Sequence, residues 1–224
     1  MKKLILLRHG QSQWNLLNRF TGWVDVSLTD KGIKEAQSAG KKIKDIPIDV
    51  IFTSELVRAQ MTATLAMDKH ESNSPLLFIH SKGKGKEWGI ESCLKEAVDR
   101  CIPTHVNWRL NERFYGKLQG MNKDEARKKF GKDQVHIWRR SFDVPPPGGE
   151  SLKMTLKRTL PYFKNEILPH LKKKNVLIAA HGNSLRAISM FIEGLSEEQV
   201  LGLEIPTGKP IIYDYDKGQF KKTK

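Results

Sequence analysis

The sequence lacks the features that would place it in a membrane or an oxidising compartment. No apolar run approaches the roughly 20 residues that span a bilayer, and the apolar part of the opening segment KKLILL is too short for a signal peptide. Only two cysteines, Cys93 and Cys101, occur among 224 residues, and neither has metal-ligand partners at a suitable spacing. We therefore expect a cytoplasmic protein with no bound metal and no membrane partner.

Acidic residues are scarce relative to basic ones. Lys and Arg number 39 against 25 Asp and Glu, which gives a formal net charge of +14 at pH 7. A nucleic acid, an anionic membrane surface and a small anionic substrate are the partners that such an excess could serve. The lysines are spread along the chain, and no aromatic-interleaved basic motif of a nucleic-acid-binding module accompanies them. Most of this charge is expected on a solvated surface, so the total does not choose among the partners.

Short apolar segments alternate with amphipathic ones, which predicts an α/β fold. The expected strands are 3–7, 48–52, 176–180 and 210–215, and the expected helices are 29–44, 54–65, 91–100, one starting near Ser151, and 184–192. Ser54 is expected to cap the second helix. Strands separated by helices imply a three-layer αβα sandwich around a mainly parallel sheet. We expect a single domain over 1–224, with residues 72–107 as a surface insertion and residues 216–224 as a mobile tail.

One short pattern occurs twice. LLRHGQS and IAAHGNS each end an apolar strand in His-Gly, with a serine three positions after the histidine. In a parallel sheet both patterns fall at the carboxyl ends of strands, where open α/β sheets bind ligands. The glycine lets the backbone turn sharply, and the start of the next helix favours an anion. A lone His-Gly is more often a turn than a catalyst, but the repeated context predicts that His9 and His181 converge on one anion-binding crevice.

Five further charged residues are candidates for the same crevice. Arg8, beside the first histidine, offers a bidentate fork suited to phosphate. From position alone, Arg58 is better explained as a surface arginine and Glu112 as the partner of a nearby arginine. Arg139 and Arg140, in HIWRR, could be helix-surface charge or a carboxylate clamp.

Seven segments resemble a known family. They are RHGQSQWN (8–15), RFTGW (19–23), TSELVRA (53–59), LNERFYGKLQG (110–120), WRR (138–140), AAHGNS (179–184) and IPTG (205–208). In this order the chain resembles the cofactor-dependent phosphoglycerate mutases of the histidine phosphatase superfamily. RHG alone would indicate only the superfamily, whereas FTGW, the LNER segment, WRR and IPTG together are more specific to the mutases.

The resemblance implies a role for each matching residue. His9 would be the nucleophile that carries the phosphoryl group, and Glu112 would handle the proton of the substrate hydroxyl. The groups around the transferred phosphoryl group would be Arg8, Arg58, His181 and Asn15, with the backbone amides of Gly182 and Asn183. The groups that hold the glycerate carboxylate and the second phosphate would be Ser12, Thr21, Gly22, Arg113, Tyr115, Lys123, Arg139 and Arg140. The resemblance also implies 2,3-bisphosphoglycerate as the primer.

These residue types suit phosphoryl transfer. A histidine nucleophile must be neutral, and with an ordinary pKa of about 6.5 it mostly is at neutral pH. A backbone carbonyl that accepts one ring N–H would fix the tautomer and leave the other nitrogen free to attack. Phosphoryl transfer depends on positioning and on cationic stabilisation, so Arg8, Arg58 and His181 could replace the Mg²⁺ of kinases. Bound phosphates would drive the carboxyl group of Glu112 toward its protonated form.

The chain departs from the family pattern at several places. Gln11 stands where glutamate is usual, and Phe114 replaces a histidine or another polar residue. The stretch from Arg58 to Glu112 is longer than usual, whereas PPPGGES (145–151) is shorter than the corresponding loop of oligomeric members. The short loop favours a monomer, with a dimer as the alternative.

The expected function is the interconversion of 3-phosphoglycerate and 2-phosphoglycerate in glycolysis and gluconeogenesis. It would proceed through a phosphohistidine at His9 and a 2,3-bisphosphoglycerate intermediate. The alternative is a histidine phosphatase or bisphosphoglycerate mutase/phosphatase on the same fold, which differs in how well the site excludes water. A basic nucleic-acid-binding protein without catalysis is disfavoured, because every candidate catalytic residue is present.

Overall fold

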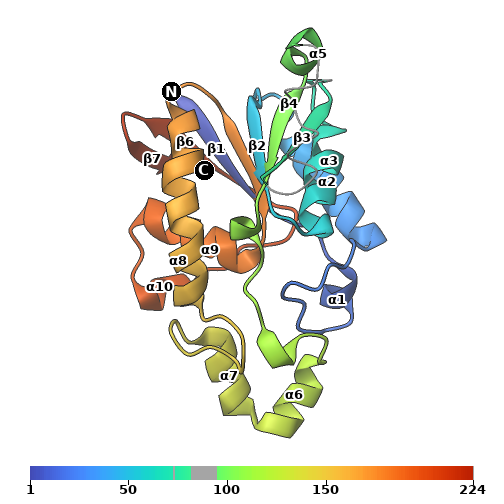
Figure 1. The fold of residues 1–224 in the computed structure, drawn as a ribbon, viewed down its shortest axis with the longest axis vertical. Coiled ribbons are helices and arrows are strands. Elements are labelled where there is room, and N and C mark those ends of the chain that lie inside the picture. Colours follow the sequence, from blue (N-terminus) through green and yellow to red (C-terminus); the bar gives the residue numbers. More distant parts are fainter. Residues whose placement is uncertain (73, 82–94, 224) are drawn as a thin grey trace.

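The computed structural model describes residues 1–72, 74–81 and 95–223, and Figure 1 shows its fold. The described strands form one seven-stranded sheet in the order β3-β4-β2-β5-β1-β6-β7. The strands are β1 (Lys2–Arg8), β2 (Val50–Thr53), β3 (Leu76–His80), β4 (Ile102–Val106), β5 (Val176–Ala180), β6 (Pro210–Asp216) and β7 (Gln219–Lys222). The helices are α1 (Gln13–Leu16), α2 (Asp30–Lys42), α3 (Val57–Met67), α5 (Lys95–Asp99), α6 (Lys123–Phe130), α7 (Lys132–Arg140), α8 (Leu152–Tyr162), α9 (Gly182–Glu193) and α10 (Glu197–Gly202).

Helices cover both faces of the sheet (Figure 1). Leu4 and Leu6 of β1 pack in a core that includes side chains of α8 and α9. Ile5 and Leu7 of the same strand belong to the opposite core, with side chains of α2 and α3. Because successive strand residues face opposite sides of a sheet, a strand covered on both faces is apolar throughout. The predicted three-layer αβα architecture is confirmed.

The sheet is mainly parallel, as predicted. β1, β2, β3, β4 and β5 all run in the same direction, whereas β6 pairs antiparallel with β1, and β7 pairs antiparallel with β6. The predicted strand 176–180 has the observed bounds, and the other predicted strands and helices differ at their ends by a few residues. Ser54 is not a helix cap: α3 begins after Leu56, and the Ser54 hydroxyl instead accepts the Leu56 N–H at 3.2 Å.

Two segments expected at the periphery contribute strands to the sheet. Within 72–107, β3 and β4 extend the sheet beyond β2, so these parts are not a surface insertion. Within 216–224, β7 pairs with β6, so this tail is ordered by ladder hydrogen bonds. The helix expected at 91–100 is observed as α5 over Lys95–Asp99, followed by Cys101. Its first residues, with Cys93 and the centre of the expected insertion, lie outside the described residues.

A smaller group of elements lies beyond the carboxyl ends of the parallel strands. Figure 1 shows α1, α6 and α7 below the sheet. Ala126 of α6 and Val135 of α7 pack with Phe20 and Leu118 in a separate small core. No helix in the described part of the chain is long and apolar enough to cross a membrane.

The close approach of α2 and α3 gives a test of the packing. A Cβ added at Gly40 would lie 2.0 Å from the Ala66 carbonyl oxygen. Gly40→Ala should lower the free energy of unfolding by roughly 1–3 kcal/mol, although alanine is the better helix former by about 1 kcal/mol. Gly202→Ala is the control, because nothing lies within 4 Å of its added Cβ. Urea unfolding measures both variants, and a Gly40→Ala protein as stable as the wild type would contradict the packing.

Candidate active site

A cavity of about 270 Å³ opens at the carboxyl ends of the parallel strands. Fourteen of the predicted site residues line it: Arg8, His9, Asn15, Thr21, Gly22, Arg58, Glu112, Arg113, Tyr115, Lys123, Arg139, Arg140, Gly182 and Asn183. Two predicted residues, Ser12 and His181, do not. The sequence therefore identified most of the lining, and it did so from segments far apart in the chain.

His9 is buried at the end of β1, with 3% of its surface exposed. Its Nδ1 lies 2.7 Å from the Gly10 carbonyl oxygen. A carbonyl only accepts, so Nδ1 carries the proton and Nε2 of the neutral ring holds a free lone pair. Gly10 has no positive φ; glycine is required because a Cβ would lie 2.2 Å from the Gly32 carbonyl oxygen.

The charge state of His9 follows from its surroundings. Burial, and then the neighbouring Arg58 and Arg8, lower its pKa well below the ordinary value of 6.5, although the hydrogen bond to Gly10 opposes them. The ring is therefore neutral at physiological pH. A buried neutral imidazole with one free nitrogen is the state that a nucleophile requires.

His181 lies behind His9, and its ring centroid is 5.0 Å from that of His9. Its Nε2 is 2.8 Å from the Ser54 hydroxyl, whereas its buried Nδ1 has no hydrogen-bond partner among the described residues. Burial, and then Arg58, His9, Arg8 and Arg158, lower the pKa of His181 well below its ordinary value. Ser54 thus orients the ring of His181, and that ring is also neutral.

Three arginines present N–H groups that the described part of the protein leaves unpaired. Arg58 is 1% exposed, and its terminal nitrogens donate to the carbonyls of Val24 and Gly22. Burial lowers the pKa of Arg58 to about 10, against the opposing effect of Glu112. The Nε atoms of Arg8, Arg58 and Arg113 are buried and have no hydrogen-bond partner among the described residues. Such donors fit an anion with several oxygen acceptors.

Glu112 is buried and accepts several hydrogen bonds through Oε1. The donors are the backbone N–H of Arg113 at 2.7 Å, and the backbone N–H and the side-chain Nδ2 of Asn183 at 3.2 and 2.8 Å. Burial opposes its ionisation, but the Arg113 N–H, Arg8, the Asn183 side chain and Arg58 together lower the pKa of Glu112 below its ordinary value. The group is thus a carboxylate without ligand, and bound phosphates would shift its pKa upward.

The remainder of the lining is strongly cationic. Eight arginine and lysine side chains face the cavity against two acidic ones, Glu112 and Glu204: Arg8, Arg19, Arg58, Arg113, Lys123, Arg139, Arg140 and Arg186. Burial, and then Arg139, lower the pKa of Lys123. Arg139 and Arg140 end α7 and point to this cavity rather than forming only surface charge. The cavity therefore suits a small ligand with several negative charges.

Six lining residues were not predicted as site residues: Arg19, Phe20, Arg186, Glu204, Ile205 and Pro206. Arg19, Phe20, Ile205 and Pro206 belong to the RFTGW and IPTG segments, so their motifs were a usable signal. Arg186 lies three positions after Asn183 on α9, which places both on one helix face, and it donates to the Asn183 side chain at 3.4 Å.

Ser12 does not line the cavity but supports a residue that does. It caps α1: its hydroxyl accepts the Asn15 N–H, and its own N–H donates to the Asn15 side chain. Asn15 itself lines the cavity. Among the described residues no group of three or more His, Cys, Asp or Glu side chains could hold a metal ion.

The comparison with known proteins identifies the class to which this fold and site belong. A model of the histidine phosphatase superfamily (branch 1) matches residues 4–78 and 92–224, so the chain belongs to this superfamily. A solved structure, Bacillus stearothermophilus YhfR, superposes with a TM-score of 0.77 at 23% identity, over 99% of this chain and 95% of that chain. That likeness supports the fold.

Closer relatives narrow the family. A 2,3-bisphosphoglycerate-dependent phosphoglycerate mutase of Protochlamydia amoebophila (strain UWE25) is 60% identical over 225 residues, covering 99% of both chains. The enzyme of the same description from Chlamydia muridarum is 51% identical, over 100% of this chain and 98% of its own. Within the superfamily the chain thus belongs with the 2,3-bisphosphoglycerate-dependent phosphoglycerate mutases, as the sequence motifs predicted.

The buried neutral histidines make stability depend on pH. Below pH of about 6.5 the unfolded chain protonates His9 while the folded protein, with its lowered pKa, does not. The unfolded state then binds more protons, so stability falls as the pH falls. His9→Asn should reduce the loss of unfolding free energy between pH 7.5 and 5.5 by roughly 1.4 kcal/mol.

Denaturant unfolding at both pH values measures this difference. His136→Asn, on an exposed position of α7, is the control and should keep the pH dependence of the wild type. An unchanged pH dependence in His9→Asn would mean that the folded protein protonates His9 as readily as the unfolded chain does.

Proposed function

We propose that this protein is a phosphoglycerate mutase that interconverts 3-phosphoglycerate and 2-phosphoglycerate through a phosphohistidine at His9. The observation that carries the proposal is the free Nε2 of a buried, neutral His9 beside a cavity with eight cationic and two acidic side chains. 2,3-Bisphosphoglycerate would prime His9 and would also be the intermediate. The full-length similarity to enzymes of this description supports the same reaction.

His9 carries the covalent step. The Nε2 lone pair attacks the phosphorus of 2,3-bisphosphoglycerate, the bond from phosphorus to the ester oxygen breaks, and that oxygen takes a proton from Glu112. The products are phosphohistidine and a monophosphoglycerate. In the second half-reaction Glu112 removes the proton of a substrate hydroxyl, whose oxygen then takes the phosphoryl group from Nε2. Positioned proton transfer of this kind contributes about 10²–10⁴-fold to rates.

Arg8, Arg58 and His181 stabilise the transferring phosphoryl group in this proposal. The buried Nε atoms of both arginines and Nδ1 of His181 have no hydrogen-bond partner among the described residues. Arg8 and Arg58 act as cations, whereas the neutral His181 acts as a hydrogen-bond donor. Donors fixed in a buried site need little reorganisation as charge develops, and the loss of one typically lowers the rate by about 10²–10³-fold. The two arginines can supply the charge neutralisation that Mg²⁺ supplies in kinases, so the proposal includes no metal.

The opposite side of the cavity holds the rest of the substrate. Arg113 donates to the Tyr115 hydroxyl at 3.2 Å and to the Trp138 carbonyl at 3.1 Å, which fixes its guanidinium. The groups assigned to the glycerate carboxylate and the second phosphate are Thr21, Gly22, Arg113, Tyr115, Lys123, Arg139 and Arg140, with Asn15 and the amides of Gly182 and Asn183 near the transferred group. Ser12 contributes indirectly, because it orients Asn15.

The departures from the family pattern leave this machinery in place. The Gln11 side chain accepts the Thr29 hydroxyl at 3.0 Å, so it serves the start of α2. Phe114 packs edge-on against Trp23, with ring centroids 5.4 Å apart. We further propose a cytoplasmic, monomeric enzyme of glycolysis and gluconeogenesis whose partners are phosphoglycerates rather than nucleic acid or membrane.

The test is conversion of 3-phosphoglycerate with and without added 2,3-bisphosphoglycerate. We expect isomerisation that the bisphosphate stimulates and that His9→Ala abolishes, since no other described histidine combines a free ring nitrogen with this cavity. Product analysis separates 2-phosphoglycerate from inorganic phosphate.

Three results would contradict the proposal. Release of inorganic phosphate without 2-phosphoglycerate would make the protein a phosphatase. Unchanged turnover in His9→Ala, or turnover that depends on Mn²⁺, would refute the phosphohistidine mechanism. His136→Ala, at an exposed position of α7, is the control and should retain wild-type turnover.

A further inference from the structure

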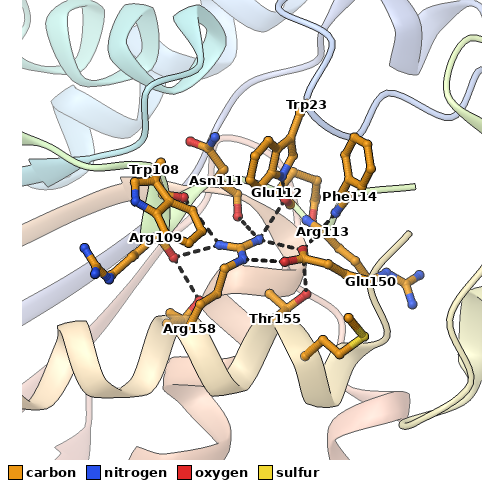
Figure 2. A network of polar contacts seen from close by, with 12 residues as sticks. Trp23, Trp108, Arg109, Asn111, Glu112, Arg113, Phe114, Glu150, Thr155 and Arg158 are labelled. Atoms are coloured by element: carbon orange, nitrogen blue, oxygen red, sulfur yellow. Dashed lines mark hydrogen bonds and ion pairs between the residues drawn. The ribbon is translucent and has the colours of Figure 1, made fainter. Parts of the chain in front are cut away.

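A buried ion pair lies behind the segment that carries Glu112. Arg158, on α8, pairs with Glu150, and their side chains are only 8% and 15% exposed. Figure 2 shows this pair at the centre of a network of hydrogen bonds. Neither residue lines the cavity, and the proposed chemistry uses neither. A buried pair of this kind is weak evidence for stability as such, because desolvation offsets its attraction.

The guanidinium of Arg158 is shared between one carboxylate and a row of backbone carbonyls. Nε and Nη2 donate to the two oxygens of Glu150 at 2.8 and 3.0 Å. The other contacts run from Nη1 to the Arg109 carbonyl at 2.8 Å, and from Nη2 to those of Asn111 and Glu112 at 3.0 and 2.9 Å. Only the planar, five-donor fork of arginine spans such a set of acceptors.

The carbonyl of Glu112 is held from a second side as well. Trp23 donates its indole N–H to the same oxygen. The guanidinium of Arg158 lies 5.6 Å from the ring of Trp23 and 5.9 Å from that of Trp108, within the range of a cation–π contact. Trp23 directly follows Gly22, whose carbonyl accepts from Arg58. The network therefore ties the Glu112 segment to the loop that holds the phosphate-facing arginine.

Glu150 holds the other end of the same turn. Its Oε2 accepts the backbone N–H of Phe114 at 3.0 Å and the Thr155 hydroxyl at 3.4 Å. The ion pair thus fixes the backbone on both sides of residue 113 (Figure 2). Arg158 donates to the carbonyl of Glu112, and Glu150 accepts the N–H of Phe114. The side chain of Glu112 extends from the first of these two anchored residues and accepts a hydrogen bond from the Asn183 side chain.

We infer that Arg158, anchored by Glu150, is a positioning residue that sets the backbone from which Glu112 transfers protons. The inference rests on the proposed function, in which Glu112 is the acid/base. A displacement of about 1 Å in a reacting group lowers rates by roughly 10²-fold. Loss of the contacts that Arg158 and Glu150 make with the backbone of residues 112 and 114 would therefore impair proton transfer. His9, at the end of β1, would stay in place.

A double-mutant cycle tests this role. The measured quantity is the single-turnover rate of phosphoryl transfer from phosphorylated His9 to 3-phosphoglycerate. Arg158→Gln should lower this rate roughly 10–100-fold in the wild-type background, but less than about 3-fold in a Glu112→Gln background, because residues that act through one another are not additive. General acid/base catalysis contributes about 10²–10⁴-fold, so the Glu112→Gln rate remains measurable over hours.

Two further variants separate positioning from stability. Thr159→Val is the matched control: Thr159 is buried on the same helix and donates to the Arg109 carbonyl at 3.0 Å, without touching Glu112. It should lower the urea midpoint yet keep the wild-type rate. Glu150→Gln keeps the side-chain volume and leaves Arg158 in the protein. It should show a smaller loss of the single-turnover rate than Arg158→Gln, and it replaces Arg158→Gln in the test if that variant does not fold.

Three outcomes would overturn the inference. They are a wild-type rate in both Arg158→Gln and Glu150→Gln, an equal loss from Arg158→Gln with and without Glu112, and an equal loss in Thr159→Val. A wild-type protein that transfers the phosphoryl group only to water would instead refute the proposed function. The cycle would then be measured on the formation of phosphohistidine, in which Glu112 still protonates the leaving oxygen.

Discussion

The parallel pairing of β1 with β5 is the constraint on which the site depends. Its register places Arg8 opposite Ala180, and the His9 N–H donates to the Ala180 carbonyl at 3.0 Å. Both strands therefore end at the same level, and the histidine that follows each strand is brought beside the other. A shift of one residue would turn the side chains of β1 to the opposite faces of the sheet. Since Leu4, Ile5, Leu6 and Leu7 are fully buried, the two cores that fix the fold also fix the distance between the rings.

The site concentrates charge of one sign where water is scarce. Burial disfavours the charged forms of Arg58 and Lys123 and lowers the pKa of each. The cationic side chains also repel one another, and the carboxylate of Glu112 offsets part of that repulsion. Glu112 raises the pKa of Arg58, and Arg58 in turn lowers the pKa of Glu112. An anionic ligand would relieve more of the repulsion than one carboxylate can. The same surroundings keep His9 neutral, so a single electrostatic arrangement favours anion binding and keeps His9 in the charge state that its proposed role as nucleophile requires.

Sequence reasoning predicted most of the residues that line the cavity because they belong to short local patterns. His-Gly at the end of an apolar strand predicts where the histidine lies, and the chemistry of His9 stays a prediction. The outer strands of the sheet were not predictable in the same way. β4, next to the edge strand β3, contains Pro103, which is unusual inside a sheet, and the edge strand β7 is mostly exposed and polar. Ser54 has the residue type and place of a helix cap, and only the fold shows that its hydroxyl meets His181.

The hydrogen bonds of Arg158 to backbone carbonyls could not be predicted from the sequence for a different reason. Its acceptors are backbone carbonyls, which every residue type provides, so residues 109, 111 and 112 carry no signature of the contact. Motifs identify side chains that act on a ligand, whereas the backbone that presents those side chains is held by residues elsewhere in the chain. α8 illustrates the difference: none of its residues lines the cavity, yet it contributes the arginine that holds the Glu112 carbonyl. The position of Glu112 thus depends on α8, a helix that a search for residues in contact with the ligand would not identify.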